Sequence, residues 1–157
     1  MASETRATRH LKTLGAAFTL HSYDYDPHAE RVGLQAAEAI GEPPRRVLKT
    51  LIIRVDGKPA CVVLPSDREL SMKKAAAAFG GKHAAMMPAP EAERLTGYKV
   101  GGVSPFGQRR SLPTIVEAAA ASEAHVYVNG GQRGLQLRLA PADLVTAAAA
   151  AMADIVA

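Results

Sequence analysis

Two pairs of β-rich segments, each joined by a short turn sequence, constrain the fold of this chain most strongly. Residues 47–55 and 60–64 carry many branched apolar side chains and flank Asp56-Gly57-Lys58-Pro59, a typical hairpin turn. Residues 125–129 and 135–139 repeat the pattern around Gly130-Gly131. Helical patterns lie between and around these pairs. This order predicts an α+β fold, with a curled, partly barrel-like mixed sheet and helices around it.

Capping and turn residues place the other elements. We predict helices over residues 5–14, 34–40, 71–79, from Pro88 or Pro90 to 96, and from Pro141 onward, and strands over 17–25 and 82–87. Residues 112–121 fit a strand or a helix. Alanine tracts at 75–78, 118–121 and 147–151 indicate helix.

The composition limits the class of protein. The 157 residues suit one domain over 1–157, with a core of Val, Leu, Ile and Ala because aromatic residues make up only 4%. A lone cysteine, Cys61, excludes an intramolecular disulfide and a cysteine zinc cluster, and favours the reducing cytoplasm. Neither a secretory signal nor an apolar run of roughly 20 residues is present, so no membrane partner is expected. A net charge of +4 suits nucleic acid or an anionic substrate without requiring either.

Lys49 stands out among the strand residues. Alternate strand residues share a face, so Lys49 lies in line with Val47, Leu51, Ile53 and Val55, all of them apolar. Burying an unpaired ammonium is costly. The lysine therefore either extends its charged end to water or serves a ligand, and the pattern alone leaves both readings open.

Two glycine-rich segments could form part of a binding site. In residues 101–107, Gly101 and Gly102 allow backbone conformations closed to other residues, and Pro105 then fixes the chain. Such a loop can present N–H groups to a carbonyl or phosphate oxygen, or it can be an ordinary tight turn. In residues 129–134, Arg133 beside glycines could bind an anion, although these residues also suit a plain hairpin turn.

Other candidate chemistry is weak. His21, Asp24 and Asp26 lack the spacing and the third ligand of a metal site, so we expect no metal, while Tyr23 could line a pocket. No catalytic serine, cysteine or histidine signature is present, so an enzyme of this sequence would need a nucleophile from outside the protein. Three basic pairs either are solvated or form a basic rim for a nucleic-acid end: Arg45-Arg46, Lys73-Lys74 and Arg109-Arg110.

Taken together, four segments resemble the YbaK/EbsC family of aminoacyl-tRNA deacylases, and they occur in the family's order over essentially the whole chain. They are residues 21–27 (HSYDYDP), 48–51 (LKTL), 97–107 (GYKVGGVSPFG) and 127–135 (YVNGGQRGL). The match looks close to the branch that hydrolyses Cys-tRNA(Pro), rather than to the alanine- or serine-editing relatives. The resemblance implies trans-editing: removal of cysteine that prolyl-tRNA synthetase has wrongly attached to tRNA(Pro), without metal or cofactor. The substrate's own sulfur would attack its ester and form a cyclic thioester.

The resemblance also assigns roles. Lys49 would anchor the aminoacyl-adenosine end of the tRNA, and Tyr23 would line the pocket. Backbone groups of three loop residues would hold the ester, and two glycines would form the opposite wall: Gly101, Gly102 and Ser104, then Gly130 and Gly131. Three more residues complete the predicted substrate site: Pro105, Asn129 and Arg133.

Two residues depart from the pattern of well-known family members. Those members often carry serine where this chain has Asn129, and some carry an acid where it has Gln136. Both differences bear on amino-acid preference. Two other functions therefore stay open: a deacylase for Ala- or Ser-tRNA, and a non-catalytic module that binds tRNA or a synthetase.

Overall fold

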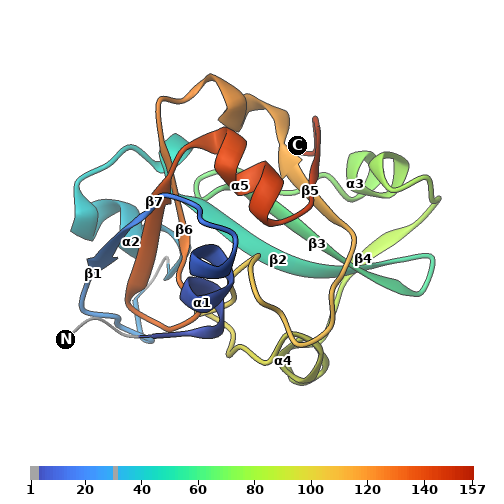
Figure 1. Cartoon of the computed structure of the whole chain (residues 1–157). Coiled ribbons are helices and arrows are strands. Elements are labelled where there is room, and N and C mark those ends of the chain that lie inside the picture. The colour runs from blue at the N-terminus through green and yellow to red at the C-terminus, as the bar shows by residue number, and fades with distance from the viewer. Residues whose placement is uncertain (1–3, 30–31) are drawn as a thin grey trace.

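The strands form two sheets that meet at one point (Figure 1). The computed structural model describes residues 4–29 and 32–157. One sheet has the order β1-β7-β6 and the other the order β4-β2-β3-β5-β8. The strands are β1 (Thr19–Ser22), β2 (Leu48–Val55), β3 (Lys58–Pro65), β4 (Ala84–Met86), β5 (Thr114–Glu117), β6 (Val126–Asn129), β7 (Leu135–Leu139) and β8 (Ala151–Ala153).

Short helices connect and cover these strands. They are α1 (Arg6–Thr13), α2 (Val32–Ile40), α3 (Met72–Ala78), α4 (Ala89–Thr96) and α5 (Pro141–Ala147), with 3₁₀ turns η1 (Pro44–Arg46) and η2 (Ala118–Ser122). None of the helices in the described part of the chain is long and apolar enough to cross a bilayer.

Both predicted hairpins are confirmed. Strands β2 and β3 pair antiparallel, and Asp56 and Gly57 turn between them with φ of 49° and 81°. Positive φ at both central residues is the turn that matches the twist of a hairpin. Strands β6 and β7 also pair antiparallel, with Asn129 opposite Gln136. The sheet is mixed, as predicted, because β5 runs parallel to both β3 and β8.

The sheets curl around a shared core but do not close into a barrel. They are joined by one parallel bridge between Val47 and Tyr127. Helix α1 packs on one face of the five-stranded sheet through Ala7 and Leu11, and α3 packs on the other face through Ala75 and Ala76. Most of the buried side chains are Val, Leu, Ile and Ala, as the composition predicts.

The alanine tracts do not all form helix. Residues 75–78 are helical, but residues 118–121 lie in the 3₁₀ turn η2. The prediction for 147–151 is wrong: α5 ends at Ala147, Ala149 reverses the chain with φ of 49°, and β8 begins at Ala151. Pairing with β5 stabilises the extended backbone there more than alanine's helix propensity stabilises a helix. Residues 112–121 divide between β5 and η2.

Candidate functional site

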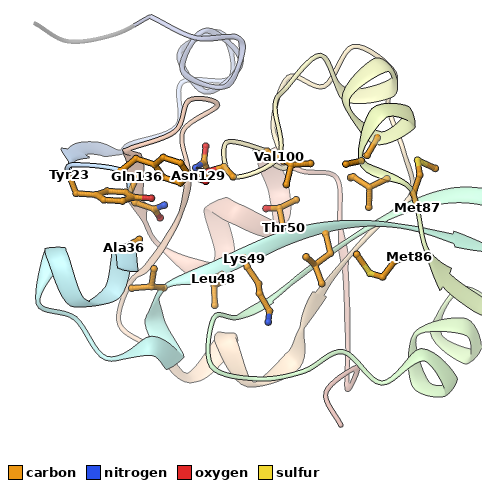
Figure 2. A pocket seen from close by; sticks show the side chains of 18 residues that line it. Tyr23, Ala36, Leu48, Lys49, Thr50, Met86, Met87, Val100, Asn129 and Gln136 are labelled. Carbon is orange, nitrogen blue, oxygen red and sulfur yellow. Dashed lines mark hydrogen bonds between the residues drawn. The ribbon is translucent and has the colours of Figure 1, made fainter. Parts of the chain in front are cut away.

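A cavity of about 400 Å³ lies along the unpaired edge of β2 (Figure 2). Strand β4 pairs with β2 only from Ile53 to Val55, and Val47 bridges to Tyr127, so residues 48–51 pair with no described strand on this side. The lining residues are Tyr23, Tyr25, Ala36, 47–52, Met86, Met87, Ala89, Ala92, Val100, Gly101, Val103, Asn129 and Gln136. Figure 2 shows Tyr23, Asn129 and Gln136 at one end and Met86 and Met87 at the other. A break in sheet pairing has thus left room for a ligand.

Strand alternation directs two neighbouring residues to opposite sides of β2. Lys49 is half-buried and lies on the same face of β2 as Ile53 and Val55, as predicted. The side chain of Thr50 points from the opposite face, toward Val100 (Figure 2). Both still border the cavity, which reaches around the strand edge. Lys49 therefore places a cation beside an apolar surface at the cavity wall.

Thr50 brings hydrogen-bonding groups to the open edge. The Met87 N–H donates to the Ile52 carbonyl at 3.1 Å on that edge. Residues two apart in a strand direct their N–H and C=O groups to the same side, so those of Thr50 face the cavity. The Thr50 Oγ1 is also buried without a hydrogen-bond partner. Buried polar atoms are normally paired, so this one indicates a place for a ligand atom.

Gln136 supplies a second unpaired atom. Its side chain is 4% exposed and its Oε1 has no partner. Its side chain also hydrogen-bonds the neighbouring Tyr23 phenol. Burial and the nearby Tyr25 raise the pKa of Tyr23, and the hydrogen bond from Gln136 opposes that rise. Tyr23 is thus a neutral phenol at pH 7, and the neighbouring Gln136 Oε1 can accept a hydrogen bond from a ligand.

The two glycine loops are interlocked at the cavity wall. Gly101 has φ of 90°, and a Cβ there would lie 2.5 Å from the Tyr25 hydroxyl. A Cβ on Gly102 would lie 2.9 Å from the backbone nitrogen of Arg133. Alanine at either position would therefore displace the facing loop or tyrosine. The glycines allow loops 100–107 and 130–134 to touch.

Asn129 fastens these loops together. Its Nδ2 donates to the Gly101 carbonyl at 3.1 Å, and its Oδ1 accepts from the N–H groups of Gly131 and Gln132 at 2.7 and 3.1 Å. Arg133 adds a bond from Nε to the Val100 carbonyl at 3.0 Å, and its guanidinium carbon lies 5.3 Å from the centre of the Tyr25 ring. Asn129 thus borders the cavity but uses its amide to position Gly101.

Four of the predicted site residues border the cavity: Tyr23, Lys49, Gly101 and Asn129. The structure places the others behind or beside its wall: Gly102, Ser104, Pro105, Gly130, Gly131 and Arg133. The Gly102 N–H already donates to the Lys99 carbonyl at 2.8 Å, and buried Ser104 accepts from the Phe106 N–H at 3.3 Å. Pro105 borders a separate cavity of about 170 Å³ beside His10. The roles predicted for these residues stay predictions.

Sequence reasoning did not assign Thr50 and the exposed apolar rim to the site. Met86 and Val100 are 48% and 45% exposed, and both border the cavity. Thr50 could have been found from its place next to Lys49 on the strand. The rim could not, because nothing in the order of residues indicates that 86 and 100 come together across β2.

The described residues that line the cavity include no serine, cysteine or histidine, and the hydroxyl of Thr50 has no base as a hydrogen-bond partner. Cys61 is fully buried in β3, and burial raises the pKa of its thiol to about 11. In residues 4–29 and 32–157, no three His, Cys, Asp or Glu side chains are grouped as metal ligands would be. The groups that line the cavity can bind and orient a ligand here.

This α+β fold and its cavity define a class of protein: the chain belongs to the aminoacyl-tRNA editing domain family, whose profile matches residues 26–147. It is 38% identical over 107 residues to EbsC of Enterococcus faecalis, named as a candidate Cys-tRNA(Pro)/Cys-tRNA(Cys) deacylase, with 67% of this chain and 65% of that protein covered. The alignment thus spans slightly less than two thirds of that relative. The resemblance seen in the sequence is confirmed at the level of the family.

Two further similarities are to a tRNA ligase and to a solved structure. The chain is 30% identical over 95 residues to a proline–tRNA ligase of Acidithiobacillus ferrooxidans, covering 60% of this chain and 17% of the ligase. A crystal structure described as a candidate trans-editing enzyme for prolyl-tRNA synthetase has the same fold, with a TM-score of 0.82, 23% identity and coverage of 99% of each chain.

Proposed function

We propose that residues 1–157 act as one editing domain in the cytoplasm, releasing cysteine in trans from the 3′ end of Cys-tRNA(Pro), and from Cys-tRNA(Cys) as well. The family supports an aminoacyl-tRNA substrate. EbsC's name supports cysteine, and the similarity to a proline–tRNA ligase supports tRNA(Pro) and prolyl-tRNA synthetase as partner. No cofactor enters the proposal.

One observation carries it: the described cavity lining has groups to hold a ligand but includes no serine, cysteine or histidine, and the Thr50 hydroxyl has no base beside it as a hydrogen-bond partner. Lys49, the orphaned oxygens of Thr50 and Gln136, and the exposed rim of Met86 and Val100 can bind an aminoacyl-adenosine. The adenine would lie against the apolar rim, and the ammonium group of the amino acid would donate to the unpaired oxygens. A substrate that brings its own nucleophile needs only to be positioned.

The proposed reaction uses the thiol of the substrate cysteine. Its thiolate sulfur forms a bond to the ester carbon, the bond from that carbon to the terminal ribose oxygen breaks, and the ribose oxygen takes a proton in place of the one the thiol lost. The products are free tRNA and a four-membered cyclic thioester. Charge grows on the carbonyl oxygen in between, where the Thr50 N–H at the open edge of β2, or the Lys49 ammonium, would stabilise it.

The direct test measures deacylation of Cys-, Ala- and Ser-tRNA(Pro) by the purified protein. We expect release from Cys-tRNA(Pro) at least about 100-fold faster than from the others, since alanine has no thiol and a hydroxyl ionises far less readily. If alanine or serine is released faster than cysteine, the substrate is Ala-tRNA or Ser-tRNA and not Cys-tRNA(Pro). A protein that binds these tRNAs and releases none would be a binding module.

Gln136→Met gives a second prediction, in which activity falls while stability changes little. Methionine keeps the length of the side chain but is only a weak hydrogen-bond acceptor, so kcat/KM for Cys-tRNA(Pro) should fall by about tenfold, which is about 1.4 kcal/mol. Removing the unpaired oxygen stabilises the protein and losing the hydrogen bond to Tyr23 destabilises it, so the free energy of unfolding should change by less than about 1 kcal/mol.

Gln108→Met is the matched control. The Gln108 amide donates to the Ser104 carbonyl at 3.1 Å, outside the cavity, so this change should lower stability and spare activity. Denaturant unfolding and steady-state kinetics measure both quantities. Full activity in Gln136→Met would remove this residue from the substrate site.

A further inference from the structure

Five arginines on one side of the molecule form no ion pair among the described residues. They are Arg6, Arg9, Arg109, Arg110 and Arg133, named here the arginine band, and all are exposed. Some other basic groups do pair with carboxylates: Arg45 and Arg46 pair with Glu123 at 3.3 and 2.8 Å, and Lys74 pairs with Asp154 at 3.0 Å. The basic rim considered from sequence therefore includes Arg109-Arg110 but not Arg45-Arg46.

Members of the arginine band lie close to one another. A Cβ on Gly97 would lie 3.5 Å from the Arg6 Nε and 3.8 Å from the Arg109 Nε, so these two side chains flank Gly97. Arg6 and Arg9 both act electrostatically on the phenol of Tyr98. Residues 109 and 110 are fixed by N–H bonds to the Thr96 and Leu95 carbonyls at 2.8 and 3.0 Å. Like charges held this close, with no ion pair to a described carboxylate, favour a polyanionic partner.

Direct contacts connect this band to the cavity. Arg133 bonds the Val100 carbonyl at the cavity rim. Along the same loop, Gly131 abuts the ring of Tyr98, at 2.8 Å from an added Cβ, and Thr5 donates to the Gly130 carbonyl at 2.6 Å. Thr5 caps α1, which carries Arg6 and Arg9. The nearby carboxylate of Glu93 accepts from the Val100 N–H at 2.9 Å, not from an arginine.

We propose that the arginine band binds backbone phosphates of the tRNA acceptor stem while the 3′ end lies in the cavity. The proposal rests on the proposed function for the identity of the RNA. Guanidinium groups match phosphate oxygens in geometry and remain charged at any physiological pH. A band that starts at the cavity rim and continues away from it fits a partner that is both an inserted end and a continuous polyanion. A protein partner would not require this continuity.

The first experiment needs no catalysis. Binding of an uncharged acceptor-stem RNA duplex with a single-stranded CCA end is measured by fluorescence anisotropy from 50 to 200 mM salt. We expect the double variant Arg6→Ala/Arg109→Ala to bind at least about tenfold more weakly, and the slope of log K against log salt to be smaller by about two. Lys73→Ala is the control, since Lys73 is an exposed cation on α3, across the sheet from α1.

A second experiment separates this proposal from the proposed function. On Cys-tRNA(Pro) the kcat/KM of the double variant should fall about tenfold. On the 3′ cysteine ester of adenosine, which has no phosphates, the kcat/KM of the variant should equal that of the unchanged protein. Unfolding midpoints equal to the unchanged protein's would show that the variant is folded. Equal RNA affinity in the double variant, or an equal loss in Lys73→Ala, would overturn the arginine band even if deacylation is found. If the protein releases no cysteine but the double variant still shows the smaller salt slope in RNA binding, only the proposed deacylation of Cys-tRNA(Pro) would be overturned.

Discussion

Methylating the thiol of Cys-tRNA(Pro) should stop its release by this protein. The thioether sulfur has no proton to lose and its lone pairs carry no charge, so it cannot form the cyclic thioester. We expect the rate to fall at least about 1,000-fold, to near the uncatalysed rate. This follows from the described residues of the cavity wall, which include no serine, cysteine or histidine, while Cys61 is buried elsewhere.

The measurement compares single-turnover release of labelled cysteine and S-methylcysteine from the same tRNA. The methylated substrate should still compete with the free-thiol substrate, which shows that it binds. The rate on the free thiol should also rise with pH until the thiol ionises, near an ordinary pKa of about 8.5. Similar rates on both substrates would instead indicate that water attacks the ester.

Lys49→Met should lose about 100-fold in kcat/KM while the protein stays folded. Methionine keeps the apolar part of the side chain against its neighbours on β2 but removes the ammonium group. A charge-assisted hydrogen bond to a substrate oxygen contributes about 1.5–3 kcal/mol, and 100-fold is about 2.7 kcal/mol. The loss should fall mainly on kcat if Lys49 stabilises the developing oxyanion, and mainly on KM if it anchors the adenosine end.

Lys58→Ala is the control for this variant. Lys58 is an exposed lysine at the other end of the same hairpin, opposite Val55, and does not border the cavity. Steady-state kinetics of both variants, with circular dichroism for folding, decide the question. Unchanged activity in a folded Lys49→Met would return Lys49 to the structural reading in which its stem packs and its charge meets water.

Local signals predicted the hairpins well because the turn residues and the strand alternation both act over few residues. The Asp56-Gly57 turn and the line of Lys49 with Ile53 and Val55 are examples. The C-terminal strand β8 was missed because its partner, β5, lies more than 30 residues earlier in the chain. No local preference of an alanine tract indicates such a partner.

The candidate site shows the same division. Lys49 and Tyr23 were found from pattern and resemblance, and both border the cavity. The glycine patterns indicated backbone freedom but not which neighbours need the space. Gly102 makes room for the backbone of the facing loop, and Gly131 makes room for Tyr98. The amide of Asn129 could bind a ligand, but its three hydrogen bonds in the structure all go to the two loops. Which polar groups remain unsatisfied, as in Thr50 and Gln136, depends on the packed structure.

The unpaired stretch of β2 has a consequence for how such a site can diversify. The N–H and C=O groups that face the cavity at Thr50 belong to the main chain, so no substitution other than proline alters their chemistry. The side chains around them, such as Gln136, Ala36 and Met87, can change independently. Part of the recognition is therefore inherited with the fold, and the remainder is free to vary. Descendants of one ancestral domain can keep the common ester end of every aminoacyl-tRNA in place while exchanging the amino acid they accept.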